Sequence, residues 1–139
     1  MLKKRLLGIC FFLGFLGILQ AQPTAHTPLI LKKLPVKDTL TVANYKVVFT
    51  RVIADSRCPK GITCIWEGEV VFELEVMKSD TLMRTERITM PPSGYTREER
   101  QTVMLNNQTG VHIYNLMPVP VANKKTPKAA YYLQLQVFN

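Results

Sequence analysis

An alternation of apolar and acidic residues, interrupted at Val71, is the feature that most constrains the fold of this chain. One parity of positions 66–76 holds Trp66, Gly68, Val70, Phe72, Leu74 and Val76, and the other holds Glu67, Glu69, Glu73 and Glu75. Because successive side chains of a β-strand point to opposite faces, this pattern predicts a strand over residues 64–77 with one face on a core and one in solvent. We expect the glutamates to pair with Arg84 and Arg87 on the next strand; a cation-binding row is the alternative.

Seven further runs of β-branched and aromatic residues, separated by turn residues, also predict strands. They lie at about 29–33, 39–43, 45–54, 82–90, 101–105, 110–115 and 130–138. In the last run Tyr131, Leu133, Leu135 and Val137 are expected to face inward. In the run 45–54 a bulge near Thr50-Arg51 would keep Arg51 out of the core. No amphipathic helical stretch stands out after residue 21, so we expect an all-β fold, an immunoglobulin-like antiparallel β-sandwich of about seven to eight strands.

The N-terminal residues predict a secretory signal peptide. Three basic residues, Lys3, Lys4 and Arg5, precede an apolar run over 6–19, which is short for a membrane span of about 20 residues. Small Ala21 stands before the expected cleavage point. An uncleaved anchor helix is the alternative, and Cys10 is not placed as in a bacterial lipoprotein. The expected organisation is a signal peptide over 1–21, a lead-in and first strand over 22–36, and a β-sandwich domain over 37–139.

The two cysteines that follow the signal peptide, Cys58 and Cys64, are expected to form a disulfide. They bracket Pro59 and Gly61, which suit a tight turn, and in an oxidising compartment such an isolated pair is most simply a disulfide. A redox pair would have the spacing Cys-x-x-Cys, and a zinc site would need both histidines of the chain, at 26 and 112, as further ligands. A cysteine nucleophile would need a reduced thiol and a histidine base.

The residues around the cysteines are expected to be structural. Asp55 is expected to accept backbone N–H bonds two residues on or to pair with Arg57, and a catalytic carboxylate is the alternative. The indole of Trp66 is expected to pack near the disulfide, and an exposed Trp66 that stacks on a ligand is the alternative.

The segment VIADSRCPKGITCIWEGEVVFELEV, residues 52–76, resembles a recurrent pattern in small secreted proteins and lipoproteins of gram-negative bacteria. The pattern is carried by Asp55, Ser56, Arg57, Cys58, Pro59, Cys64, Ile65, Trp66 and Gly68. The later LMPVP and the closing YYLQLQV are similar to the tail of that family, so the resemblance touches most of residues 39–139. Glu67 stands where a small residue is frequent. The resemblance implies export and fold, with Asp55, Arg57, Pro59, Trp66 and Gly68 as a structural motif, and it implies no activity.

No catalytic set, cofactor motif or metal-ligand set can be placed by spacing. We therefore expect a non-enzymatic binding or structural module of the bacterial envelope, in the periplasm, on the outer surface or secreted, with no cofactor. Its partner is expected to be a protein or a glycan of the envelope. Without the three basic residues of the signal peptide the formal net charge falls from +8 to +5, which does not indicate nucleic acid, and no membrane span is expected after cleavage.

Two alternative functions remain open at this point. A protease inhibitor could present the loop 58–64, with Lys60 in a trypsin-like pocket, because a disulfide-bounded loop is pre-organised. An enzyme could use a carboxylate and histidine site built from Asp55, His112 or the glutamate row.

Two loops and two threonines complete the candidate surface features. The loops over 91–100 and 118–128 are rich in proline and charge. The second is long for a hairpin, and we expect it to be a solvated crossover between sheets; a functional or mobile loop is the alternative. The triplets around Thr39 and Thr81, both Asp-Thr-Leu, resemble the acceptor of a bacterial O-glycosylation system, which predicts possible modification of these two threonines.

Overall fold

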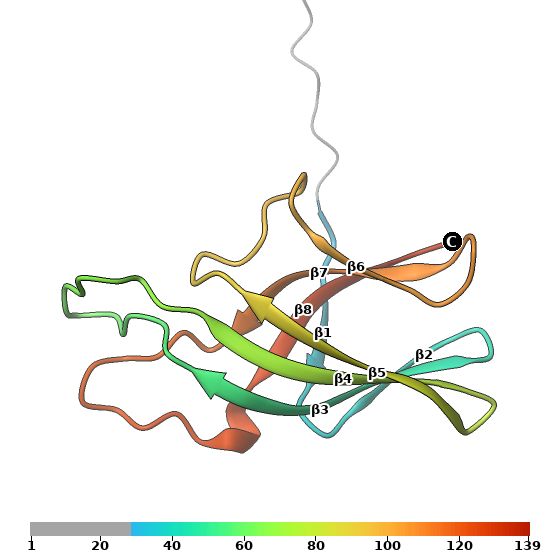
Figure 1. The fold of residues 1–139 in the computed structure, drawn as a ribbon, viewed down its shortest axis with the longest axis horizontal. Coiled ribbons are helices and arrows are strands. Elements are labelled where there is room, and N and C mark those ends of the chain that lie inside the picture. Colours follow the sequence, from blue (N-terminus) through green and yellow to red (C-terminus); the bar gives the residue numbers. More distant parts are fainter. Residues whose placement is uncertain (1–28) are drawn as a thin grey trace, which may run out of the picture.

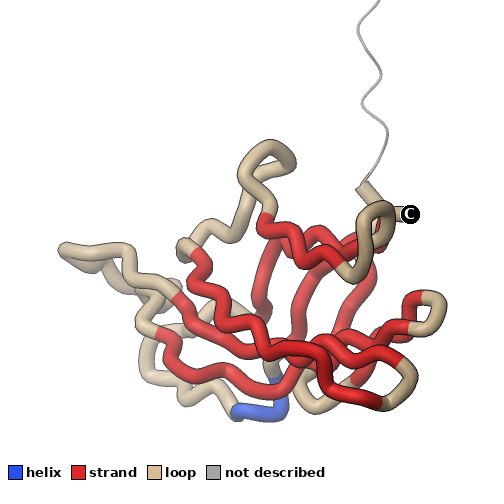
Figure 2. Tube along the Cα trace, turned by 45° about the vertical axis from the view of Figure 1, so that its right-hand side comes forward, coloured by secondary structure: helices blue, strands red, loops and turns tan. Residues whose placement is uncertain are grey.

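Two four-stranded antiparallel sheets face each other in the computed structural model, which describes residues 29–139 (Figures 1 and 2). The predicted signal peptide, Cys10 and His26 lie outside the described residues. The first sheet has the order β1 (Lys32–Pro35), β8 (Tyr132–Phe138), β7 (Gly110–Met117) and β6 (Gln101–Met104). The second has the order β2 (Thr39–Val42), β3 (Tyr45–Asp55), β4 (Val70–Lys78) and β5 (Thr81–Met90). The predicted antiparallel β-sandwich is confirmed.

Most connections between strands stay within one sheet, and three of them (β2–β3, β4–β5 and β6–β7) are short hairpins. Strands β2 to β5 form one meander and β6 to β8 form another, so the chain crosses between the sheets from β1 to β2 and from β5 to β6. The immunoglobulin-like expectation therefore holds for the two-layer architecture, while the connectivity is that of two meanders. A short 3-10 helix, η2 (Lys128–Ala130), precedes β8. Within residues 29–139 no helix is long and apolar enough to cross a membrane.

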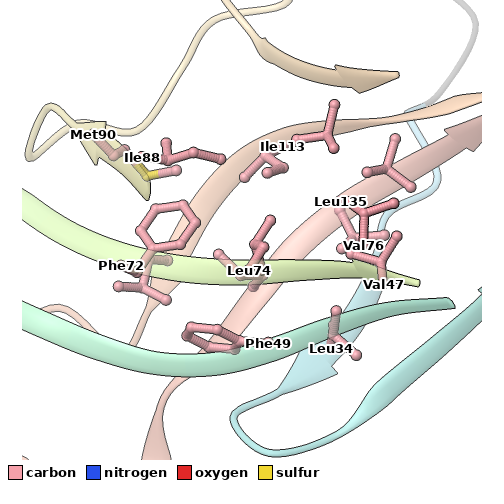
Figure 3. Packing of buried hydrophobic residues seen from close by; sticks show 14 of the residues in the cluster. Leu34, Val47, Phe49, Phe72, Leu74, Val76, Ile88, Met90, Ile113 and Leu135 are labelled. Atoms are coloured by element: carbon pink, nitrogen blue, oxygen red, sulfur yellow. The ribbon is translucent and has the colours of Figure 1, made fainter. Parts of the chain in front are cut away.

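The core consists of the inward-facing residues of both sheets (Figure 3). The rings of Phe49 and Phe72 meet edge to face, with 5.9 Å between their centroids. The alternation that predicted β4 and β8 is confirmed by full or nearly full burial of Val70, Phe72, Leu74, Val76, Tyr131, Leu133 and Leu135. Val137, also predicted to face inward, is partly buried against the same core. Complete burial of a large aliphatic or aromatic side chain stabilises a fold by about 1.5–3 kcal/mol, so this period-two pattern accounts for the sandwich.

The bulge predicted near Thr50-Arg51 is present. The register of β3 against β4 shifts between Phe49 and Arg51, so that Arg51 faces Glu73 instead of the core. The Nε of Arg51 lies 3.2 Å from Oε1 of Glu73. The extra residue thus turns the cation outward while Phe49 stays fully buried.

The predicted pairing of the glutamate row with β5 is confirmed at one position and wrong at another. Arg87 Nη2 lies 4.0 Å from Oε2 of Glu73. Arg84 instead pairs with Glu86 on its own strand, with Nε 2.6 Å from Oε1. The arginines of these pairs are at least one-third exposed, and surface pairs contribute about 0–1 kcal/mol each. Glu67 and Glu69 are exposed, whereas Glu73 and Glu75 are half-buried, so only part of the acidic row is solvated.

Candidate binding site at the disulfide loop

The connection between β3 and β4, residues 56–69, projects beyond the ends of the sheets, and we call it the disulfide loop (Figure 1). Cys58 and Cys64 are joined by a disulfide with a Cα–Cα distance of 5.9 Å, as predicted. Two backbone hydrogen bonds close the base of the loop, from Ser56 N to Glu69 O at 2.9 Å and from Cys58 N to Glu67 O at 2.8 Å. The loop is therefore cross-linked within itself and paired at its root.

Gly68 stands where the two arms of the loop approach most closely. Its φ of +77° lies in the left-handed region, and a Cβ built there would lie 1.9 Å from the carbonyl oxygen of Ser56. Only glycine adopts this backbone conformation without penalty and leaves room for the facing carbonyl. The glycine of the sequence motif is thus explained by close approach of two backbones.

The predicted start of β4 at residue 64 is wrong, because the strand begins at Val70. Residues 64–69 belong to the loop, since the left-handed conformation at Gly68 ends the extended backbone on which the alternation depends. Alternate side chains point to opposite faces only where the backbone forms a strand. The inward direction that the pattern assigned to Trp66 therefore does not apply.

Trp66 does not pack against the core, and the expectation that its indole lies near the disulfide stays a prediction. The residue is 64% exposed, and Ile62 and Ile65 are also exposed. We call these three side chains the apolar tip of the disulfide loop. The alternative of an exposed tryptophan matches the structure. The sequence contained an indication of this exposure. Ile65 is apolar, but it shares the alternating positions of the glutamates, which were expected to face solvent.

The root of the loop is held by a buried ion pair between Asp55 and Arg57. Nη2 of Arg57 lies 2.6 Å from Oδ2 of Asp55, and Nε donates to Oδ1 at 2.8 Å. The backbone N–H of Arg57 also donates to Oδ1, at 3.2 Å. The side chains are 1% and 8% exposed for Arg57 and Asp55, respectively. Both predicted roles of Asp55, acceptor for the backbone and partner of Arg57, are confirmed together.

Arg57 also connects the loop to the C-terminal part of the chain. Its Nη1 donates to the carbonyl of Leu116 at 2.7 Å, and its Nη2 donates to that of Pro118 at 3.0 Å. The hydroxyl of Tyr131 donates to Oδ2 of Asp55 at 2.9 Å. The three segments that carry the family resemblance, DSRCP, LMPVP and YYLQLQV, therefore meet in one hydrogen-bonded network.

The network changes the acidity of two of its members. Burial tends to raise the pKa of Asp55, but the hydrogen bonds and charge of Arg57 and the hydroxyl of Tyr131 outweigh burial and lower that pKa below 3.8. Burial and the neighbouring carboxylate of Asp55 raise the pKa of Tyr131. Asp55 is therefore a stable anion that serves the fold, and this environment does not suit proton transfer near neutral pH.

The loop over 118–128 supports the disulfide loop from one side. It joins β7 to β8 within one sheet, so the expected crossover between sheets is wrong. Lys60 N donates to Pro120 O at 2.9 Å, and Ala122 N donates to Lys60 O at 3.0 Å. An extended inhibitor segment bound by a protease would use such main-chain groups itself. Because both main-chain groups of Lys60 are already bonded, the structure does not favour Lys60 as the residue that enters a protease.

The segment 91–100 borders the disulfide loop on another side. Pro92 and Ser93 line a hollow of about 450 Å³ together with Cys58, Ile62, Thr63, Cys64 and Glu67. Both loops that the sequence marked as candidates thus adjoin the disulfide loop. Sequence reasoning could not place this hollow, because its two walls are far apart along the chain.

The residues considered for an enzyme site do not gather here. His112 lines a different cavity, and Asp55 lines neither that cavity nor the hollow beside the disulfide. Among residues 29–139 no group of three or more His, Cys, Asp or Glu side chains is placed to hold a metal ion. The feature that this end of the molecule presents is the apolar tip.

Removing the disulfide is expected to lower the free energy of unfolding by about 2–2.5 kcal/mol, because the closed loop is short. The variant Cys58→Ser/Cys64→Ser should show this loss in urea unfolding. Mass spectrometry of the wild-type protein, isolated without reducing agent, should find no free thiol at either position. Two free thiols in that protein would contradict the disulfide.

A functional assignment from similarity would need a matching family, relative or structure. None was found: no family model, no curated protein and no solved structure matches this chain.

Proposed function

We propose that the protein is an exported, non-enzymatic binding module that holds a protein or glycan of the bacterial envelope against the apolar tip of its disulfide loop. The observation that carries the proposal is the exposure of Trp66, Ile62 and Ile65 on one short loop. Exposed apolar clusters rimmed by polar residues are typical of interaction sites. Tryptophan is also enriched among the residues that dominate binding energy.

The way the tip is held supports a binding role over a merely structural one. The disulfide, the backbone pairing at the root and the contacts of Lys60 with residues 120 and 122 fix the loop before any partner arrives. A pre-organised loop loses little conformational entropy on association. Exposed apolar side chains lower solubility, so their rigid presentation is better explained by a partner than by the fold, to which they add no burial.

The proposal of export rests on the signal-peptide pattern over residues 1–21, and the disulfide is compatible with it. Thr39 and Thr81 are exposed at the first positions of β2 and β5, which keeps them candidates for O-glycosylation. Thr81 lies at the opposite end of β4 from the disulfide loop (Figure 1). A glycan there would leave the apolar tip accessible.

Trp66→Ala is expected to abolish partner capture while the fold is retained. A photo-crosslinking residue at position 65, which is fully exposed, should give a defined adduct in native envelopes, and Trp66→Ala in the same protein should reduce that adduct at least tenfold. The free energy of unfolding should change by less than about 0.5 kcal/mol, because the indole is exposed.

The matched control places the same photo-crosslinking residue at position 82. Leu82 is 52% exposed on β5, near the end of the sandwich away from the disulfide loop. We expect no corresponding adduct from this position. Equal adducts from positions 65 and 82, or an adduct at 65 that survives Trp66→Ala, would contradict binding through the apolar tip.

A further inference from the structure

A separate cavity of about 320 Å³ lies on the outer face of the sheet β1-β8-β7-β6. Its walls come from β7, β8 and the segment 91–100, and include Arg97, Arg100, His112, Tyr114, Gln136 and Phe138. The volume is at the lower end of the range for ligand sites. It suits a molecule about the size of a monosaccharide.

Side chains that can carry a positive charge are prominent in the lining of this cavity. Its lining contains two arginines and a histidine, and no carboxylate side chain. The Nε of Arg100 is buried and has no hydrogen-bond partner, while its Nη1 donates to the backbone carbonyl of Arg97. Buried donors in folded proteins nearly always have a partner, so this N–H is a candidate donor to a ligand bound in the cavity.

His112 is held in one orientation within the cavity. Its Nδ1 lies 2.9 Å from Oγ1 of Thr102, and its ring stacks on Phe138 with 4.1 Å between the centroids. The ring nitrogen that would meet a ligand is therefore Nε2. Across the cavity the hydroxyl of Tyr114 lies 3.1 Å from Oε1 of Gln136, so the amide nitrogen of Gln136 is a further donor to ligand oxygens.

We propose that this cavity binds the carboxylate or phosphate group of a small hydroxylated ligand, an acidic sugar in chemical class. The oxyanion would accept the N–H of Arg100 and of His112, in the charge-assisted geometry that arginine forms with carboxylates and phosphates. The hydroxyl groups would meet Tyr114 and Gln136. This site is independent of the apolar tip and does not rest on the proposed function.

The test is a titration of the mature protein, followed by amide NMR, with three probes: glucuronate, glucose 6-phosphate and glucose. At least one of the two anions should give saturable shifts at His112, Tyr114 and Gln136, and the one that binds more tightly identifies carboxylate or phosphate. Glucose should bind at least tenfold more weakly. No saturable shift with either anion at millimolar concentration would overturn the proposal.

Two variants make the test specific to the cavity. Arg100→Gln should weaken binding of the anion at least tenfold, whereas Arg84→Gln, which alters an arginine of β5 paired with Glu86, should leave it unchanged. If the anion bound Arg100→Gln as tightly as the wild-type protein, its binding would be non-specific charge attraction. That result would overturn the proposal. Crosslinking at position 65 should be unaffected by Arg100→Gln, so the two proposals can fail separately.

The titration of His112 gives a second readout. Burial and the charge of Arg100 lower its pKa in the free protein; the other titratable groups that line the cavity are Arg97 and Tyr114. A bound anion favours the protonated ring and should raise this pKa, and glucose should not. A pKa of His112 that is the same with and without the anion would show that the ligand binds elsewhere.

Discussion

Replacing Arg57 by methionine is expected to lower the free energy of unfolding by about 3–5 kcal/mol, the usual loss when one partner of a buried ion pair is removed. The carboxylate of Asp55 would remain buried without its cation, with the hydroxyl of Tyr131 as a remaining donor. The carbonyls of Leu116 and Pro118 would also lose the donor that now reaches them. Urea unfolding at pH 7 measures the change.

Arg84→Met is the matched control for this prediction. Arg84 pairs with Glu86 and donates to the backbone carbonyl of Met104, both at exposed positions. Because water can replace these partners, its removal should change the free energy of unfolding by less than about 1 kcal/mol. The double variant Asp55→Asn/Arg57→Met removes the unpaired charge but leaves both carbonyls without a donor, and it should recover only part of the loss. An Arg57→Met protein as stable as Arg84→Met would contradict the structural role of the network.

The same network predicts how stability depends on pH. Because the pKa of Asp55 is lower in the folded protein than the ordinary 3.8, its contribution is fully present above that ordinary value and is lost as the pH falls toward the folded-state pKa. In Arg57→Met the carboxyl is buried without a cation, its pKa should rise, and this acid-side loss should disappear. Urea unfolding repeated at several pH values below 5 distinguishes the two profiles.

The parts of the fold that were predictable from the sequence are those governed by local rules. Alternation predicted the inward faces of β4 and β8, and the bulge followed from the difficulty of burying Arg51 beside Phe49. The Asp55–Arg57 pair was predictable because its members are two residues apart. In each case the deciding interaction lies within a strand or a turn.

The candidate site was only partly predictable, because it depends on contacts between distant segments. Arg57 and Leu116 are 59 residues apart in sequence, and no periodicity links them. Trp66 was misplaced because the alternation runs on through Gly68, although the backbone there leaves the strand conformation. The apolar tip is therefore a consequence of the turn at Gly68, which spacing alone does not reveal.

The two proposed sites share one segment of the chain. In the segment 91–100, Pro92 and Ser93 border the hollow beside the disulfide, whereas Arg97 and Arg100 line the basic cavity. Gly94 lies between them with a positive φ, and Tyr95 N donates to Tyr114 O at 2.7 Å. This backbone anchor on β7 separates the two halves of the segment, so a ligand at one site has no direct contact with the other.

Gly68→Ala is expected to lower the free energy of unfolding by about 3 kcal/mol or more, within the class of large effects that arise from backbone strain and steric overlap. A left-handed conformation alone costs a non-glycine residue about 1–2 kcal/mol. The added Cβ would also lie 1.9 Å from Ser56 O, so the two arms of the loop would have to separate. The hydrogen bonds from Ser56 and Cys58 that close the root should weaken with them.

Gly61→Ala separates these two causes. Gly61 also has a positive φ, +97°, but a Cβ there would meet only the Cβ of Ala122, at an ordinary 3.8 Å. This variant should therefore lose only the conformational part, about 1–2 kcal/mol. Urea unfolding of both variants, followed by the fluorescence of the single tryptophan, measures the difference. Equal losses would mean that close approach of the arms does not restrict position 68, and that the apolar tip is held by the disulfide and the Lys60 contacts instead.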